Sequence, residues 1–186
     1  KTFAPTGKFT TLLVLLCLGL DRKLSIRQFD FKSAFLFAPL DETIYIKRPL
    51  GSKRSTDFLK LKKSLYGLKQ APMNWYKTLT NWLNQINYHQ SSSDPCLFIK
   101  NSHDSFVFFH VDDLIVAGGV DKFEKEFLSR FPDSSAHEPD SLLGMKLKNK
   151  DKFITLHQPD LIKKCLEMLN LKECQSVKTP LSPAVK

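Results

Sequence analysis

Two adjacent aspartates, Asp112 and Asp113, interrupt the most strand-like stretch of the sequence, which reads FFHVDDLIVAGG over residues 108–119. β-branched and aromatic residues flank them, and the pattern predicts two short strands that meet at the aspartates. Aspartate is a common turn residue, so a polar hairpin tip is one interpretation. A metal site is the other, because hard divalent cations prefer carboxylate oxygens and a tight turn between strands holds such groups in place.

A third aspartate, Asp30, lies within the apolar stretch 24–41. A carboxylate is costly to bury unless a positive charge neutralises it. A salt bridge to Arg27 or Lys32 is one solution, and a metal ion is the alternative. If the strands that carry Asp30 and Asp112 share a sheet, their carboxylates could hold the cations of a phosphoryl-transfer site, which lie about 3.5–4 Å apart.

Basic and aromatic residues alternate in the segment 60–76, which lies between these aspartates in the sequence. The set comprises Lys60, Lys62, Lys63, Lys69, Tyr66, Trp75 and Tyr76. Such a mixture suits phosphates and stacked bases, and Gly67 permits a close approach of the backbone to a ligand. The alternative is a solvated lysine face over aromatic residues of the core.

The composition allows a folded domain with a sizeable core. The chain has 186 residues, of which 42% are hydrophobic and 11% aromatic, and this excludes disorder. The net charge of +9 favours a polyanionic partner, nucleic acid first and an anionic membrane second, although it could also serve solubility. The cysteines match neither a disulfide scaffold nor a zinc motif, so reduced thiols in an intracellular protein are expected.

The apolar segment 10–20, TTLLVLLCLGL, is too short to cross a bilayer as a helix. A signal peptide is an alternative, but no clean cleavage site follows, and a buried helix is the better interpretation.

Strands and helices are predicted in a mixed order, without a regular βαβ alternation, which favours the α+β class. A helix begins at Pro72 and another at Pro159, and Asp121 is expected to cap a short helix. Residues 131–140 are expected to form a loop. The predicted strands cover residues 44–47, 58–61, 97–100, 106–117, 142–147 and 153–156.

Several blocks, in order, resemble the reverse transcriptase of copia-type LTR retrotransposons. They are TFAP at 2–5, FDFKSAFLFAPLDETIYIKRP at 29–49, LKLKKSLYGLKQAPMNWY at 59–76, SDPCLFIK at 93–100, HVDDLIVAGG at 110–119, LLGMKL at 142–147 and VKTPL at 177–181. The resemblance covers nearly the whole chain. It implies a palm-like antiparallel sheet backed by helices, with partial fingers and the start of a thumb.

The resemblance also implies a role for each matching residue. Asp30, Asp112 and Asp113 match the catalytic aspartates, with Asp30 and Asp112 as the principal metal ligands and Asp113 as the lesser one, since adjacent strand residues face opposite ways. The residues that match the nucleotide-binding positions are Phe31, Phe35, Tyr66, Gly67, Lys69 and Gln70, with Phe35 closing the sugar pocket. Leu143, Gly144 and Met145 match the loop that grips the primer.

The implied activity is RNA-directed DNA synthesis with Mg²⁺ or Mn²⁺ as cofactor. The implied partners are an RNA template, a DNA primer, deoxynucleoside triphosphates and the remainder of a retrotransposon polyprotein, with no membrane. We expect residues 1–157 to form the palm and residues 158–186 a thumb-like helix and tail. A cytoplasmic particle or the nucleus is the expected location, and secretion is not expected.

Some positions depart from the family pattern. His110 replaces a tyrosine, Ser134 a lysine, His137 a glycine and Leu13 an arginine, and Leu36-Phe37-Ala38 stands where L-N-G is usual. The resemblance also leads us to expect basic fingers strands before TFAP, whereas this sequence begins at Lys1. Two hypotheses therefore stay open: a polymerase palm that is catalytic in its full-length context, and a non-catalytic, truncated remnant that binds nucleic acid weakly.

Overall fold

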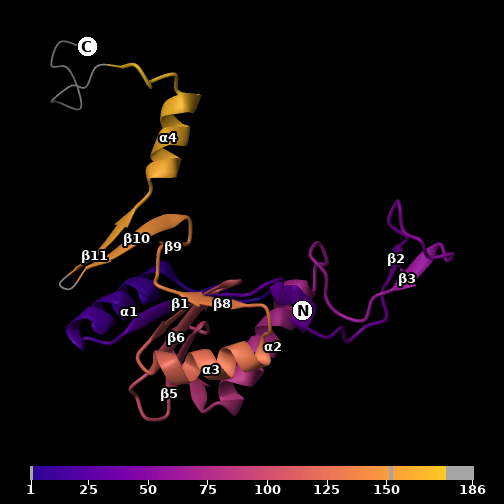
Figure 1. Cartoon of the computed structure of the whole chain (residues 1–186), viewed down its shortest axis with the longest axis horizontal. Helices are drawn as coiled ribbons and strands as arrows, with labels where there is room; N and C mark the ends of the chain where they lie inside the picture. The colour runs from indigo at the N-terminus through magenta and orange to yellow at the C-terminus, as the bar shows by residue number, and fades with distance from the viewer. Residues whose placement is uncertain (1, 151–152, 175–186) are drawn as a thin grey trace.

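A six-stranded antiparallel sheet forms the centre of the computed structural model, which describes residues 2–150 and 153–174 (Figure 1). Its strands are short and rich in β-branched and aromatic residues, as strands buried on both faces tend to be. In spatial order they are β4 (Tyr88–Gln90), β5 (Leu97–Lys100), β6 (Phe106–His110), β7 (Asp113–Ala117), β1 (Ile26–Asp30) and β8 (Ser135–His137).

Helices α2 (Ala71–Gln85) and α3 (Val120–Arg130) cover one face of this sheet. Pro72 lies in the first turn of α2, where its missing N–H has no intrahelical partner to lose. The layer between helices and sheet is dominated by aromatic rings, which accounts for much of the high phenylalanine content. Its members include Phe29, Phe31, Trp75, Trp82, Phe123, Phe127 and Phe131.

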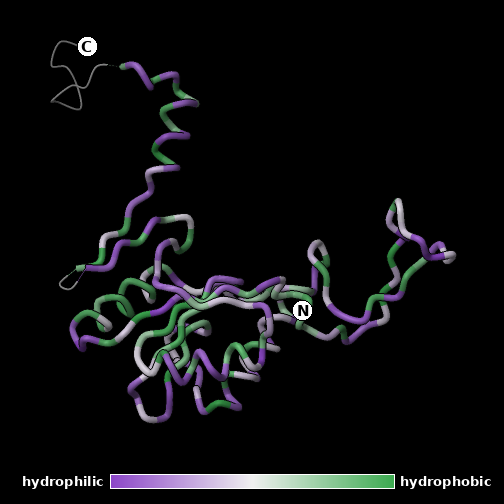
Figure 2. The backbone as a smooth tube through the Cα atoms, in the orientation of Figure 1, coloured by the Kyte–Doolittle hydropathy of each residue, from purple (hydrophilic) through white to green (hydrophobic). Residues whose placement is uncertain are grey.

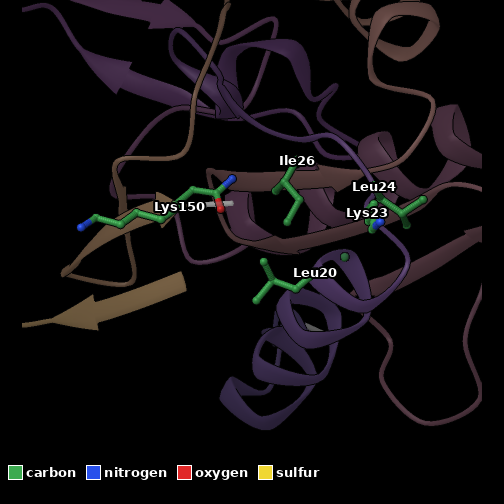
Figure 3. A pocket seen from close by; sticks show the side chains of 7 residues that line it. Leu20, Lys23, Leu24, Ile26 and Lys150 are labelled. Atoms are coloured by element: carbon green, nitrogen blue, oxygen red, sulfur yellow. The ribbon is translucent and has the colours of Figure 1, made fainter. Parts of the chain in front are cut away.

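Helix α1 (Phe9–Asp21) and a second sheet cover the opposite face. The second sheet consists of β9 (Ser141–Leu142), β10 (Met145–Lys150) and β11 (Phe153–His157). Its apolar side chains pack with those of α1 against the central sheet. Beside this layer lies an open hollow of about 220 Å³, whose lining includes Leu20, Lys23, Leu24, Ile26 and Lys150 (Figure 3).

Two elements stand apart from this layered body (Figure 1). One is the hairpin of β2 (Tyr45–Lys47) and β3 (Phe58–Lys60), and the other is α4 (Pro159–Met168). Polar and apolar residues alternate along both of them (Figure 2), and α4 has no buried residue. Among the described residues, no helix is long and apolar enough to cross a membrane.

The observed α+β class and the antiparallel sheet agree with the prediction from sequence. The apolar segment 10–20 lies in α1, which is buried along one side as expected. The predicted loop 131–140 is wrong in part, because it contains β8, an edge strand held by backbone bonds to β1 rather than by an apolar pattern. Asp121 does not cap α3; the N-cap is Gly119, and Asp121 lies in the first turn. The VKTPL block at 177–181 lies outside the described residues.

Gly118, which ends β7, is expected to be intolerant of any side chain. Its φ is +81°, and a Cβ would lie 2.1 Å from the carbonyl oxygen of Asp104. Gly51 has the same φ of +81° but nothing within 4 Å of that position. Left-handed backbone alone costs an alanine about 1–2 kcal/mol, and forced overpacking adds about 1–3 kcal/mol.

We therefore predict that Gly118→Ala lowers the free energy of unfolding clearly more than Gly51→Ala does. Urea unfolding of both variants measures the difference. Equal losses in the two variants would show that the contact with Asp104 does not constrain the end of β7.

Candidate active site

The pairing of β1 with β7 places Asp30 directly opposite Asp113. Residues opposite each other in an antiparallel pair project from the same face, with Cβ atoms about 4.5–5.5 Å apart. On this face the strands also carry Ile26 and Ile115, which belong to the apolar layer beneath α1. The two carboxylates therefore lie at the end of the face that α1 and the second sheet cover.

The turn between β6 and β7 consists of Val111 and Asp112. Val111 has a φ of +59°, which is strongly disfavoured for a β-branched residue. The indole nitrogen of Trp75 donates a hydrogen bond to the Val111 carbonyl oxygen at 3.0 Å. Trp75 is itself 2% exposed, so a rigid group of the core holds the strained turn in place.

Asp112 is half-buried at the tip of this turn, and only one of its oxygens is satisfied. The Tyr66 hydroxyl donates to Oδ2 at 3.3 Å, whereas Oδ1 is buried and accepts no hydrogen bond from any described residue. Burial raises the pKa of Asp112, the hydrogen bond from Tyr66 lowers it, and the charge of Asp113 raises it again. A buried carboxylate oxygen without a donor is suited to a cation.

Asp113 contacts the block that resembles the primer grip. The backbone amide of Leu143 acts on its carboxylate and opposes the rise of its pKa. Leu143 and Gly144 form the two-residue turn between β9 and β10, both with positive φ, and Met145 is the first residue of β10. Burial raises the pKa of Asp113, the amide of Leu143 lowers it, and the charge of Asp30 raises it. The second sheet thus reaches the carboxylates through the turn between β9 and β10.

Asp30 has a partner that the sequence did not suggest. Nε2 of His137 lies 2.8 Å from its Oδ2, and β8 brings the two together by pairing with β1. This hydrogen bond raises the pKa of His137. Arg27, one of the two partners expected for Asp30, instead forms ion pairs with Asp121 at 3.5 Å and with Glu124.

The residues expected to bind the nucleotide do not all lie together. The rings of Phe35 and Tyr66 are 4.4 Å apart between centroids, so these two form one wall beside Asp112. The Cβ position of Gly67 is open, with a φ of +95°. Phe31 packs in the core against Trp75 at 4.6 Å and is 8% exposed.

Lys69 and Gln70 line a separate hollow of about 310 Å³, which they share with Asp41 and Glu42. The predicted nucleotide-binding residues thus divide between the turn and this hollow, while Phe31 lies in the core.

Within residues 2–150 and 153–174, no three carboxylate, imidazole or thiol groups converge as a ready-made metal site. The donor chemistry nevertheless fits a hard cation, because Asp112 offers an unpaired buried oxygen and Asp30 and Asp113 share one face. His137 and Trp75 are the contacts that sequence reasoning missed. His137 lies in a polar segment without strand periodicity, and Trp75 was expected either to stack on bases or to lie in the core, neither of which indicated a hydrogen bond to the turn.

A family model described as reverse transcriptase (RNA-dependent DNA polymerase) matches residues 1–183. The chain belongs to this family. Among its relatives are two retrovirus-related Pol polyproteins of plants, from transposon TNT 1-94 of Nicotiana tabacum, which is 32% identical, and from transposon RE1 of Arabidopsis thaliana, which is 33% identical. In both cases the alignment covers 100% of this chain. The transposon Ty1-BL Gag-Pol polyprotein of Saccharomyces cerevisiae is 29% identical over 86% of the chain.

These relatives are copia-type retrotransposon proteins, as the sequence blocks indicated. The reverse transcriptase chain spans 15% of the tobacco polyprotein, 13% of the Arabidopsis one and 10% of the yeast one.

The raised pKa of Asp112 makes a prediction about stability. A folded-state pKa above the ordinary value of 3.8 means that folding favours the protonated carboxyl. Its stabilising contribution is complete below pH 3.8 and is lost as the pH rises through the raised pKa. We therefore expect Asp112→Asn, which cannot ionise, to raise Tm at pH 7 by about 2–4 °C.

The gain should disappear near pH 3. Asp57→Asn, at an exposed position of the β2–β3 loop, serves as the control and should change Tm little at either pH. Calorimetry across this pH range makes the measurement. A destabilised Asp112→Asn at pH 7 would contradict the burial of an ionised carboxylate at the turn.

Proposed function

We propose that this reverse transcriptase domain catalyses nucleotidyl transfer to a primer 3′ end, with Asp30, Asp112 and Asp113 as the catalytic carboxylates. One observation carries the proposal: the register of β1 and β7 sets Asp30 against Asp113 beside a turn whose Asp112 has a buried, unpaired oxygen. Membership of the family supplies the reaction class, RNA-directed DNA synthesis. In this proposal the six-stranded sheet and the helices that cover it form the palm.

Asp30, Asp112 and Asp113 would hold Mg²⁺ or Mn²⁺. When bound, these ions supply the positive charge that stabilises the attacking and leaving oxygens of the transfer. The chain's own contribution is to fix the carboxylates in advance. Strand pairing holds Asp30 and Asp113, while the bond from Trp75 to the Val111 carbonyl holds the turn that carries Asp112.

Tyr66 and Phe35 serve the incoming deoxynucleotide in this proposal. The Tyr66 hydroxyl binds Oδ2 of Asp112 and leaves Oδ1 for the cation. The ring of Phe35 packs on that of Tyr66 and would lie against the sugar, where its bulk opposes a 2′-hydroxyl. Leu143 and Gly144, at the turn beside Asp113, would position the primer end.

A non-catalytic domain that binds nucleic acid is the second candidate. The contact between His137 and Asp30 favours it, because a carboxylate oxygen that accepts from an imidazole is less available to a cation. Both candidates predict nucleic-acid binding, so only a test of the carboxylates separates them.

Primer extension on a primed RNA template, with a polypeptide that contains this chain, provides the test. We expect Asp30→Asn and Asp112→Asn each to reduce extension by about a thousandfold, since metal charge stabilisation is worth several kcal/mol. The exposed Asp57→Asn variant should extend normally.

Binding of Mn²⁺, followed as a rise in Tm of the chain itself, gives a readout that does not depend on activity. The rise should shrink in both aspartate variants and persist in Asp57→Asn. If the unmodified protein neither extends the primer nor gains stability from Mn²⁺ or Mg²⁺, the catalytic proposal fails and the binding domain remains.

A further inference from the structure

The hairpin of β2 and β3 presents aromatic and basic side chains together on one face. In its register Tyr45 lies opposite Lys60, and Lys47 lies opposite Phe58. Opposed residues share a face, as do residues two apart on one strand. The four side chains therefore form a two-by-two pattern in which each aromatic ring has a lysine beside it and a lysine across from it.

These side chains are open to solvent, although aromatic rings are usually buried. Tyr45 is 62% exposed and Phe58 is 59% exposed. The other face of the hairpin carries Ile46 and Leu59, which are half-buried. The aliphatic residues of the hairpin are thus more buried than its aromatic residues. Burial of apolar area alone would favour the opposite arrangement.

The backbone of the hairpin is well ordered by hydrogen bonds at both ends. The N–H of Arg48 donates to the Asp57 carbonyl at 2.8 Å, and the N–H of Leu61 donates to the Ile44 carbonyl at 2.9 Å. In addition, Nη1 of Arg48 donates to the Arg54 carbonyl at 2.8 Å and so closes the loop. The four outward side chains therefore stand on a preformed platform.

Charge is concentrated around this platform. Residues 44–63 contain seven lysines and arginines and one aspartate, a net charge of +6 in a chain whose total is +9. Beyond Lys60 the chain continues through Lys62 and Lys63 to Tyr66, whose hydroxyl contacts Asp112. A basic path thus connects the platform with the proposed catalytic turn.

We infer that the outward face of the β2–β3 hairpin, formed by Tyr45, Lys47, Phe58 and Lys60, binds single-stranded nucleic acid by stacking bases on its two rings and contacting phosphates with its two lysines. This inference rests on the proposed function for the identity of the strand, the unpaired part of the template. Aromatic platforms in a positive setting bind single strands with little sequence preference, because every base has a π face. Paired bases in a duplex do not expose these faces.

The spacing of the rings agrees with this occupant. Diagonal neighbours on adjacent strands are about 7–8 Å apart. Successive bases in a stacked strand are separated by about 3.4 Å. Tyr45 and Phe58 are diagonal neighbours in this register, so their positions are about two base steps apart.

Fluorescence anisotropy with a labelled oligouridylate and with an abasic strand of equal length tests the inference. The double variant Tyr45→Leu/Phe58→Leu keeps the apolar character but removes the rings. It should bind oligouridylate on the order of tenfold or more weakly, with an unchanged salt slope and unchanged binding of the abasic strand. The variant Phe58→Trp should retain binding.

The double variant Lys47→Gln/Lys60→Gln should weaken binding of both strands. It should also reduce the slope of log affinity on log salt by about 1.4, at about 0.7 for each phosphate contact on a single strand. Phe9→Leu, at a 45% exposed ring on α1, is the matched control and should bind like the unmodified chain. Tm values confirm that all variants are folded.

The inference is overturned if Tyr45→Leu/Phe58→Leu binds oligouridylate as tightly as the unmodified chain. It is also overturned if that variant loses only binding to anionic vesicles or self-association, which would assign the face to a membrane or a protein. Asp30→Asn should bind oligouridylate normally. If Asp30→Asn loses primer extension but still binds oligouridylate, the inference about the hairpin stands. If Tyr45→Leu/Phe58→Leu extends the primer but binds oligouridylate as tightly as the unmodified chain, the inference about the hairpin fails and the catalytic proposal stands.

Discussion

The pairing of β1 with β7 is the interaction on which the site depends. It is a backbone register, and through it five consecutive positions of β1 face five of β7, ending at Asp30 and Asp113. Because side chains alternate along each strand, the other residues of β1 and β7 face one side of the sheet or the other. Phe29 and Leu114 enter the aromatic layer beneath α2 and α3, while Ile26 and Ile115 enter the layer beneath α1. The carboxylates come together because the two hydrophobic layers on either side of the sheet hold this register.

The strained turn is the second requirement, and the core stabilises it. A valine with positive φ costs about 1–2 kcal/mol relative to ordinary backbone, and the turn keeps this conformation because Trp75 holds its carbonyl. Trp75 is fixed in turn by Phe31 and Phe131, at ring distances of 4.6 and 5.7 Å. The aromatic layer therefore has a role in the site, because it fixes the ring that holds the turn. Phe31 acts through Trp75 in this arrangement.

The sequence predicted those elements whose pattern of residues has a single physical cause. The strands around Asp112, the helix at Pro72 and the helix at Pro159 follow from periodicity and proline placement, and all are present. Strand β8 could not be predicted, because an edge strand needs only backbone partners and residues 135–137 show no apolar alternation. The contact of His137 with Asp30 was missed for the same reason. Its only signal was a histidine where the resemblance led us to expect a glycine, and that departure does not indicate which residue the histidine contacts.

The alternation in β1 also sets which kinds of sequence change this domain can absorb. His110, Ser134 and His137 depart from the family pattern expected from the sequence, and the strands around them keep the register that pairs Asp30 with Asp113. A single inserted codon between Ile26 and Phe29 would be different, because side chains repeat every two residues and each one after the insertion would change face. Asp30 would then point into the aromatic layer, and Phe29 would point toward the carboxylates. Exposed point substitutions therefore leave the backbone register in place, whereas one small insertion in β1 would separate Asp30 from Asp113.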